Sequence, residues 1–304
     1  WHVSVGSPAH ELARNDSIII AGLVMGAIYG MVGLGYSIIF RASGIMNLAQ
    51  SEMVTLASLI GVTLYQTLGL PFWLSLALTM VIMFLFGALL QVGIVSRFNE
   101  RGVKGIYMVL VTLGLSKIMN GSCELIFGAN PVRFPPIFSV STVKVLGTII
   151  TPERILSFFL SALAMLAIHL FLTRTKTGIA TRACASDALA AEACGINVVN
   201  SNAIVWGLAS ASAAICGMML GPIYGAAITL GGKVGTKGMA SSVSGGFGNI
   251  YGAMVGGLLL GMVESFVGGY VNSTMKDMVA YLLLFLMLCV RPTGLFNEQA
   301  IRDV

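Results

Sequence analysis

The sequence predicts an all-α fold, a polytopic bundle of about eight transmembrane helices. Apolar residues make up 57% of the 304 residues and charged residues only 10%, whereas a water-soluble domain carries about 25% charge. Apolar runs of helical length recur along the chain, without the alternating polarity over ~10 residues that marks the strands of a membrane β-barrel. Because one helical crossing takes ~20 residues, the chain has room for roughly eight to ten crossings and for no sizeable soluble domain.

We expect one spanning helix in each of eight apolar runs. The first run follows Asp16, is too long for the apolar region of a signal peptide and is expected to be retained. The last run has 13 residues, reaches only ~20 Å and is expected to borrow Ser273–Asp277. The runs are Ile18–Phe40, Met53–Leu70, Pro71–Val95, Gly105–Gly128, Ile155–Leu172, Ala203–Leu220, Ile250–Val267 and Met278–Val290.

Glycine spacing predicts where helices can pack closely. Glycine recurs at four-residue spacing at Gly22, Gly26 and Gly30 in the first run, and at Gly257 and Gly261 in the seventh. In lipid no hydrophobic effect drives helices together, and faces of small residues let two backbones approach each other. Both runs therefore carry a face suited to close helix packing.

Short basic loops predict the orientation of the chain. Basic residues follow the third and fifth runs, which places both loops on the cytoplasmic side; they are Arg97, Arg101, Lys104, Arg174, Lys176 and Arg182. The amino terminus and Gly128–Arg154 then face outward, with a small hairpin expected where Phe138–Val145 alternates. Eight crossings would place Arg291 outside as well, which disagrees with the tendency of basic residues to lie on the cytoplasmic side. The stretch Gly221–Asn249, rich in glycine and serine, is therefore a candidate for an extra, broken or re-entrant crossing.

The sequence contains no motif of an enzyme or of a nucleotide site. Gly232–Lys233 lacks the spacing of a P-loop, and His169 stands alone in the fifth run, where helix packing is the simpler interpretation. The five cysteines match neither a disulfide framework nor a metal-ligand spacing. The net charge of +5 reflects the bias of cytoplasmic loops rather than binding of nucleic acid. We expect no catalytic residues, no metal site and no cofactor bound by this chain.

Polar residues in or between the apolar runs are the candidates for a solute path. A charge near a helix centre costs about 2.5–3.5 kcal/mol, so Glu264 is expected either to line the path or to hold an interhelical hydrogen bond or a partner interface. Asn47–Glu52 forms either an interfacial turn, with Ser51 or Asn47 capping the next helix, or a broken helix that contacts the solute. The candidate pathway residues are Asn47, Gln50, Ser51, Glu52, Lys117, Asn120 and Glu264.

The segment Thr173–Asn200 predicts a short helix in a cytoplasmic loop. Ser186 or Asp187 can cap its alanine-rich stretch, and Gly195 with Asn197 ends it. Leu189 is its only bulky apolar residue, which is too little for a membrane anchor. The helix is better suited to docking in a cleft of another protein.

The chain resembles the permeases of ABC importers for branched-chain amino acids over nearly its whole length. The landmarks are Gly22–Gly35, Gly44–Glu52, Thr112–Gly114, Phe127–Pro135, Arg182–Asn197, Gly245–Gly261 and Arg291–Phe296. The length resembles that of the shorter of the two permease subunits in such systems. The family usually has Asn-Phe-Ala-His-Gly-Glu where this chain has Asn-Leu-Ala-Gln-Ser-Glu over Asn47–Glu52. Permeases for urea and short amides share most of the landmarks.

The resemblance implies one permease domain over residues 1–304, in a bacterial inner membrane, that translocates branched-chain or other apolar amino acids. The implied partners are a second related permease, two cytoplasmic ATPase subunits that use ATP, and a periplasmic solute-binding protein. The implied coupling loop lies within residues 173–200 and docks into an ATPase through Arg182, Ala185, Asp187, Ala191, Glu192, Gly195 and Asn197. The alternatives are a urea or short-amide permease and, from another class, a stand-alone secondary transporter or channel.

Overall fold

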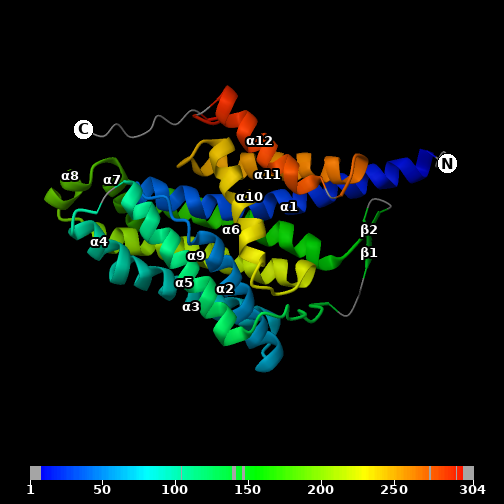
Figure 1. The fold of residues 1–304 in the computed structure, drawn as a ribbon, viewed down its shortest axis with the longest axis horizontal. Coiled ribbons are helices and arrows are strands. Elements are labelled where there is room, and N and C mark those ends of the chain that lie inside the picture. The colour runs from blue at the N-terminus through cyan, green and yellow to red at the C-terminus, as the bar shows by residue number, and fades with distance from the viewer. Residues whose placement is uncertain are drawn as a thin grey trace.

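The computed structural model describes residues 8–103, 105–138, 142–145, 148–273, 275–291 and 293–296. Within these ranges the chain is almost entirely helical, which confirms the predicted α-helical bundle (Figure 1). The elements in chain order are α1 (Pro8–Ser43), α2 (Gln50–Val62), a π-helical turn η1 (Thr63–Thr67), α3 (Phe72–Leu90), a second π-helical turn η2 (Gln91–Val95), α4 (Ser96–Glu100), α5 (Ile106–Phe127), β1 (Val143–Val145), β2 (Thr148–Ile150), α6 (Pro152–Arg174), α7 (Lys176–Ser186), α8 (Ala188–Ala193), α9 (Val198–Tyr224), α10 (Leu230–Gly245), α11 (Ile250–Tyr270) and α12 (Lys276–Val290).

Each of the eight predicted runs forms a helix, but the helices differ in length. Six helices of the described residues are long and apolar enough to cross a membrane: Arg14–Ser43, Phe72–Glu100, Ile106–Phe127, Pro152–Arg174, Val198–Tyr224 and Ile250–Tyr270. The helices α2, α10 and α12 are shorter. The number of crossings therefore stays a prediction of eight to ten.

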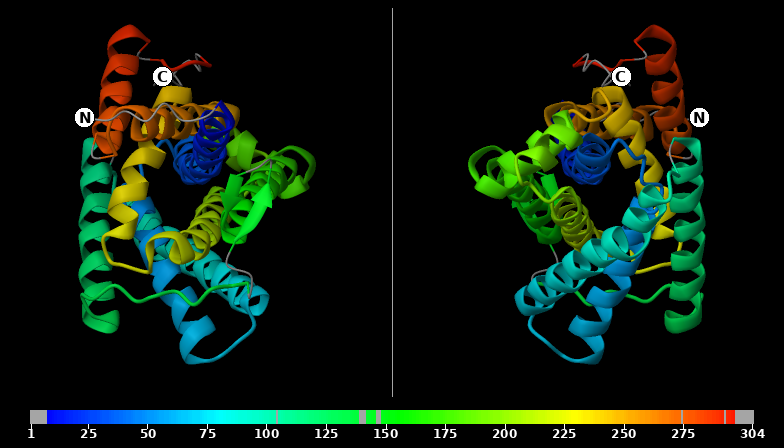
Figure 2. Two further views of the ribbon diagram at one scale, coloured as in Figure 1. Left: turned by 90° about the vertical axis from the view of Figure 1, so that its right-hand side faces the viewer. Right: turned by 90° about the vertical axis from the view of Figure 1, so that its left-hand side faces the viewer.

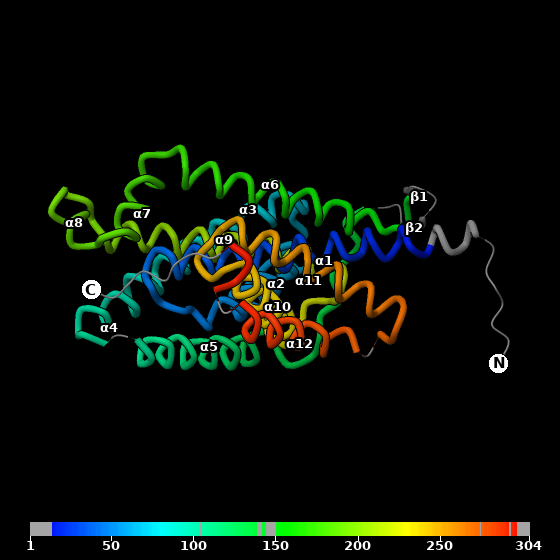
Figure 3. Tube along the Cα trace, turned by 90° about the horizontal axis from the view of Figure 1, so that it is seen from above, coloured from blue at the N-terminus to red at the C-terminus, as the bar shows by residue number. Residues whose placement is uncertain are grey.

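The short elements gather at the two ends of the long helices. Figures 1 and 3 show α4, α7 and α8 at one end, and the strands β1 and β2 at the other, near the start of α6. The predicted hairpin exists but lies further along the chain, with Val143 opposite Ile150 and Val145 opposite Thr148. Residues 139–141 of the predicted stretch, like Lys104 of the basic loop, lie outside the described residues. The predicted coupling loop and the predicted external loop thus occupy opposite ends of the bundle.

The first helix forms the centre of the packing. Helix α1 contacts α6, α9, α10 and α11, and Figure 2 shows it among them in both end views. Tyr29, Met31 and Leu34 on this helix are almost completely buried. By contrast, α3, α5 and α12 carry many exposed apolar side chains, among them Leu85, Ile118 and Phe285, as expected of helices at the surface of a membrane bundle.

The two glycine faces predicted from the sequence pack against each other. A Cβ atom added at Gly26 of α1 would lie 2.8 Å from the Cα atom of Leu258, and one at Gly261 of α11 would lie 2.3 Å from the backbone nitrogen of Gly26. No side chain larger than hydrogen fits at such distances. The backbones of α1 and α11 are therefore in direct contact, as small-residue faces permit in lipid.

The stretch Gly221–Asn249 contains the end of α9, a short connector and the buried helix α10. In the connector, Ala226 forms an isolated antiparallel bridge with Val132. Helix α10 then crosses the direction of the longer helices (Figure 1). Its glycines allow the crossing, since a Cβ atom at Gly231 would lie 2.1 Å from the carbonyl oxygen of Ser51, and one at Gly238 would lie 2.4 Å from a side-chain carbon of Val32.

The end of the described chain lies at the same end as α7 and α8. The backbone N–H groups of Leu295 and Phe296 donate hydrogen bonds to the carbonyl groups of Ser244 and Gly245, where α10 ends. The ring of Phe247 beside them packs on Phe40, near the end of α1, at 4.5 Å between ring centroids. The placement of Arg291 opposite the basic loops, which eight crossings implied, is therefore wrong. The stretch that contains α10, between the end of α9 and the start of α11, returns the chain toward the basic end.

Candidate functional site

The polar cluster before α2 lies inside the bundle. Asn47 and Gln50 are each at most 1% exposed. The Oδ1 atom of Asn47 accepts a hydrogen bond from the backbone N–H of Ala49 at 3.1 Å, and the Nε2 atom of Gln50 donates to the carbonyl oxygen of Ala209 in α9 at 3.0 Å. Neither Asn47 nor Ser51 caps α2 in the way the sequence suggested. The cluster is the buried start of a helix, not a turn at the membrane surface.

Glu52 connects this cluster to two other helices. Its Oε2 atom accepts hydrogen bonds from Nδ2 of Asn120 in α5 at 3.0 Å and from Oγ1 of Thr55 at 3.3 Å. Thr55 also accepts a hydrogen bond from the backbone N–H of Gly231 in α10 at 3.0 Å. The structure therefore brings together the predicted pathway residues Glu52 and Asn120. Lys117, from the same helix as Asn120, is exposed on the outside of the bundle.

Glu264 belongs to a separate charged cluster. Its Oε1 atom lies 2.7 Å from the Nζ atom of Lys237, and Oδ1 of Asp277 lies 2.6 Å from the same nitrogen. Lys237 also donates to the hydroxyl oxygen of Tyr29 at 3.3 Å. Lys237 and Glu264 are at least nine-tenths buried, whereas the side chain of Asp277 is 62% exposed. The interhelical role expected as one alternative for Glu264 is thus present in the structure.

Sequence analysis missed Lys237 because it lies outside the apolar runs, in a stretch rich in glycine and serine. A signal was nevertheless available. Val234, Lys237 and Ser241 follow one another at spacings of three and four residues, which places them on one face of a helix. All three are buried in α10. A lysine on the buried face of a membrane helix needs a carboxylate partner.

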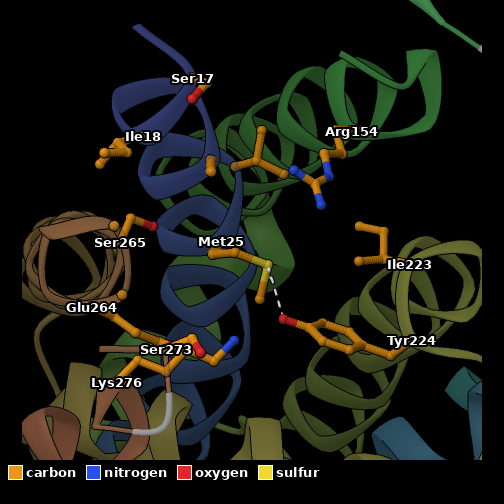
Figure 4. Close-up of a pocket in the computed structure, with 14 residues that line it drawn as sticks. Ser17, Ile18, Met25, Arg154, Ile223, Tyr224, Glu264, Ser265, Ser273 and Lys276 are labelled. Carbon is orange, nitrogen blue, oxygen red and sulfur yellow. Dashed lines mark hydrogen bonds between the residues drawn. The ribbon is translucent and has the colours of Figure 1, made fainter. Parts of the chain in front are cut away.

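Two cavities lie on either side of this charged cluster. The larger, of about 420 Å³, lies between α1, the start of α6, the end of α9 and α11, and Glu264 and Arg154 are among its lining residues (Figure 4). The second, of about 340 Å³, is lined by residues that include Lys237 and Asp277. Both cavities lie away from the end that carries α7 and α8.

The predicted coupling loop folds into two short helices with defined ends. The Oδ1 atom of Asp187 accepts a hydrogen bond from the backbone N–H of Ala190 at 2.9 Å and so caps α8. Gly195 has a φ of 82°, in the region that only glycine adopts readily, and lets the chain leave the helix. Asn197 accepts a hydrogen bond from the N–H of Asn200 at 2.9 Å and caps α9. The predicted start and end of α8 are confirmed at Asp187, rather than Ser186, and at Gly195, whereas Asn197 caps the start of α9 and does not end α8.

One side of the predicted coupling loop is exposed, and the other side contacts the bundle. Leu189 is 80% exposed at the tip of the predicted cytoplasmic end of the molecule. Glu192 is also exposed, while Ala191 is buried. Arg182 donates to the carbonyl oxygen of Thr173 at 3.4 Å. Ala185 lines a cavity of about 210 Å³ that also includes residues from the end of α1 and the start of α11. Helix α8 contacts α7 and α9, and α7 in turn contacts α1, α6 and α9, so a force applied to α8 would reach these helices.

Comparisons with known proteins show the family to which this chain belongs. A family model described as the branched-chain amino acid transport system / permease component matches residues 18–288. The high-affinity branched-chain amino acid transport system permease protein LivH of Salmonella typhimurium is 29% identical over 294 residues, which cover 93% of this chain and 96% of that protein. BraD of Pseudomonas aeruginosa, a permease protein with the same description, is 30% identical over 300 residues, with coverages of 94% and 97%. Among solved structures, PsaBC from Streptococcus pneumoniae in complex with Fab aligns with a TM-score of 0.48 and 14% identity over 90% of this chain and 91% of that chain. The chain belongs to the family of permease components of branched-chain amino acid transport systems.

Proposed function

We propose that this chain is the permease subunit of an ATP-binding-cassette importer in a bacterial inner membrane. The observation that carries the proposal is α8, a capped helix of six residues with Leu189 projecting from the end of the bundle. A helix with one exposed apolar side chain is too weak a membrane anchor and suits a cleft in a protein. The sequence contains no P-loop, so two separate ATPase subunits supply the energy.

Charge on the surface of α5 supports a second permease as partner. Lys117 is exposed there, next to Ile118, which is 67% exposed. An ammonium group that faces lipid near a helix centre costs about 2.5–3.5 kcal/mol. Contact with a related permease, or with a water-filled path between the two, removes this cost. A second permease against this face of α5 is therefore part of the proposal.

The relatives named above support branched-chain or other apolar amino acids as the solute. A periplasmic binding protein delivers the solute, and the permease pair opens to one side at a time. Closure of the ATPase dimer is transmitted through the coupling loop to the helices that contact it. The chain itself then binds no cofactor, and ATP is used by its partners.

Copurification and reconstituted uptake test this proposal. The tagged chain is expected to copurify with an ATPase, and vesicles that hold the complete complex are expected to take up labelled leucine only with ATP. Glu192→Ala in the exposed face of α8 should reduce uptake about tenfold while ATP hydrolysis continues, since coupling between two sites is typically worth 1–3 kcal/mol. Glu100→Ala, an exposed glutamate at the same end of the molecule, is the matched control.

The competing functions give different results in the same vesicles. A stand-alone secondary transporter moves leucine without any ATPase, driven by a proton or sodium gradient. A urea or short-amide permease takes up labelled urea with ATP, shows no ATP-driven uptake of leucine, and its urea uptake is unaffected by leucine and valine. Either result overturns the proposal.

A further inference from the structure

The ion pair of Lys237 and Glu264 separates the two cavities. Glu264 lines the larger cavity, and Lys237 lines the smaller one. Tyr224 and Lys276 line both. A molecule in the larger cavity therefore lies on the carboxylate side of the pair.

The carboxylate of Glu264 is only half satisfied. Its Oε1 atom is bound by Lys237, whereas its Oε2 atom is buried and has no hydrogen-bond partner among the described residues. A buried polar atom without a partner costs about 1–3 kcal/mol, and more when it is charged. Because Glu264 lines the cavity, this oxygen calls for a donor that enters there.

Basic groups lie on the same cavity. Arg154, in the first turn of α6, points into it from the side opposite Glu264 (Figure 4), and Lys276 contributes a second cation. Apolar side chains, among them Ile18, Met25 and Ile223, and several serines complete the lining. The cavity of about 420 Å³ is in the size range of small-molecule sites, which are largely apolar with a few placed polar groups.

We infer that this cavity binds a free α-amino acid as its zwitterion. The α-ammonium group binds Glu264, the α-carboxylate binds Arg154 with support from Lys276, and an apolar side chain lies against Ile18, Met25 and Ile223. The inference rests on the proposed function, because it assigns a site for the transported solute. It also goes further, since the site selects for solutes that carry an ammonium group and a carboxylate group on the same carbon atom. Urea and short amides carry neither charge.

Protection of a cysteine placed in the cavity tests the inference. Met25→Cys is introduced into the complex in membrane vesicles, in a chain whose exposed Cys194 and Cys289 are replaced by serine, and its reaction with a maleimide is measured. Leucine is expected to slow the reaction. Leucinamide, which lacks the carboxylate, and N-acetyl-leucine, which lacks the ammonium, are expected to protect only at concentrations at least about tenfold higher, because one charged hydrogen bond is worth about 1.5–3 kcal/mol.

Two variants test which side chain binds the carboxylate and which binds the ammonium group of the amino acid. Arg154→Ala should raise the leucine concentration for half-protection at least about tenfold and abolish the discrimination against leucinamide. Arg133→Ala, an exposed arginine in the loop before α6 that is absent from the lining of this cavity, should change neither value. Glu264→Gln should abolish the discrimination against N-acetyl-leucine, with the amount of assembled complex measured alongside. Arg154 is at the protein surface, so its variant stays informative even where Glu264→Gln fails to assemble.

The outcomes separate this inference from the proposed function. If ATP-driven uptake of leucine is intact but leucine gives no protection, or protects no better than leucinamide, the site is wrong and the function stands. If the complex shows no ATP-driven uptake of any amino acid, the proposed function fails, and this inference fails with it.

Discussion

Lys237 is the residue whose chemistry most constrains the interior of this protein. It lies on α10 and binds carboxylates from α11 and α12 at 2.7 and 2.6 Å. The pair with Glu264 is buried and therefore little screened by water, whereas Asp277 is largely exposed and adds less. Removing one partner of a buried pair leaves a desolvated charge, which costs more than the pair itself contributes.

Lys237→Met is expected to destabilise the protein by about 3–5 kcal/mol, the usual cost of breaking a buried ion pair. The thermal unfolding midpoint of the purified complex in detergent measures the effect. Lys233→Met is the matched control, because Lys233 is exposed on the same helix. The double variant Lys237→Met with Glu264→Gln should recover most of the loss, since no unpaired buried charge remains. An unchanged midpoint in the single variant contradicts the structural role given to the pair.

At the scale of elements, the contact of α1 with α11 depends on the absence of side chains. Glycines of the two helices lie against each other's backbones, and the space for a Cβ atom at Gly26 or Gly261 is already occupied. A membrane bundle gains association energy from such close van der Waals contact. The contact also connects Glu264, on α11, to the central helix.

Gly26→Ala is expected to lower the stability of the complex by about 1–3 kcal/mol, because the added methyl group forces two packed backbones apart. Gly114→Ala on α5 is the control, since a Cβ atom there meets nothing within 4 Å. Alanine favours a helix by about 1 kcal/mol over glycine, so the control should be neutral or slightly more stable. Equal melting temperatures of the two variants would show that α1 and α11 are further apart than described.

At the scale of the whole molecule, the proposed contact with an ATPase requires that the end with α7 and α8 faces the cytoplasm. The helices α7 and α8 of the predicted coupling loop and α4 share one end, and the hairpin β1–β2 lies at the other. Leu295 and Phe296, after α12, bind the end of α10. The positive-inside rule assigns the first end to the cytoplasm. Docking of α8 on a cytoplasmic ATPase requires the same orientation.

Cys194 reports this orientation. It is exposed at the end of α8, whereas Cys184 in the same loop is buried and is a poor probe. In a chain whose exposed Cys289 is replaced by serine, an impermeant thiol reagent is expected to label the chain in inside-out vesicles and to lose this labelling when Cys194 is also replaced by serine. In sealed cells Cys194→Ser should change nothing, while Arg133→Cys in the loop before α6 should be labelled. Labelling of Cys194 from outside the cell would show that the protein has the opposite orientation. The proposed contact of α8 with a cytoplasmic ATPase would then be impossible.

Local patterns predicted much of the architecture. Apolar runs of helical length correspond to eight of the helices, glycine spacing identified the two faces that meet between α1 and α11, and Asp187 and Gly195 were assigned correctly to the start and the end of α8. Asn197, predicted to help end that helix, caps the start of α9 instead. These features depend on neighbours within a few residues, so their physical cause is visible in the chain itself. The glycines and serines of Gly221–Asn249 lower its hydropathy, so the sequence marked this stretch as a candidate for an extra, broken or re-entrant crossing but did not identify α10 (Leu230–Gly245) as a buried helix.

The sequence by itself determined that the chain is a helical membrane bundle, which segments form its helices and where the helix caps of the coupling loop lie. Only the tertiary structure decided which polar groups meet: Glu52 with Asn120, and Glu264 with Lys237, each pair on different helices. It also decided that the end of the chain returns to the side of the coupling loop. The physical reason is that hydropathy and capping are local, whereas a buried charge takes its partner from whichever helix the packing of small residues brings within reach.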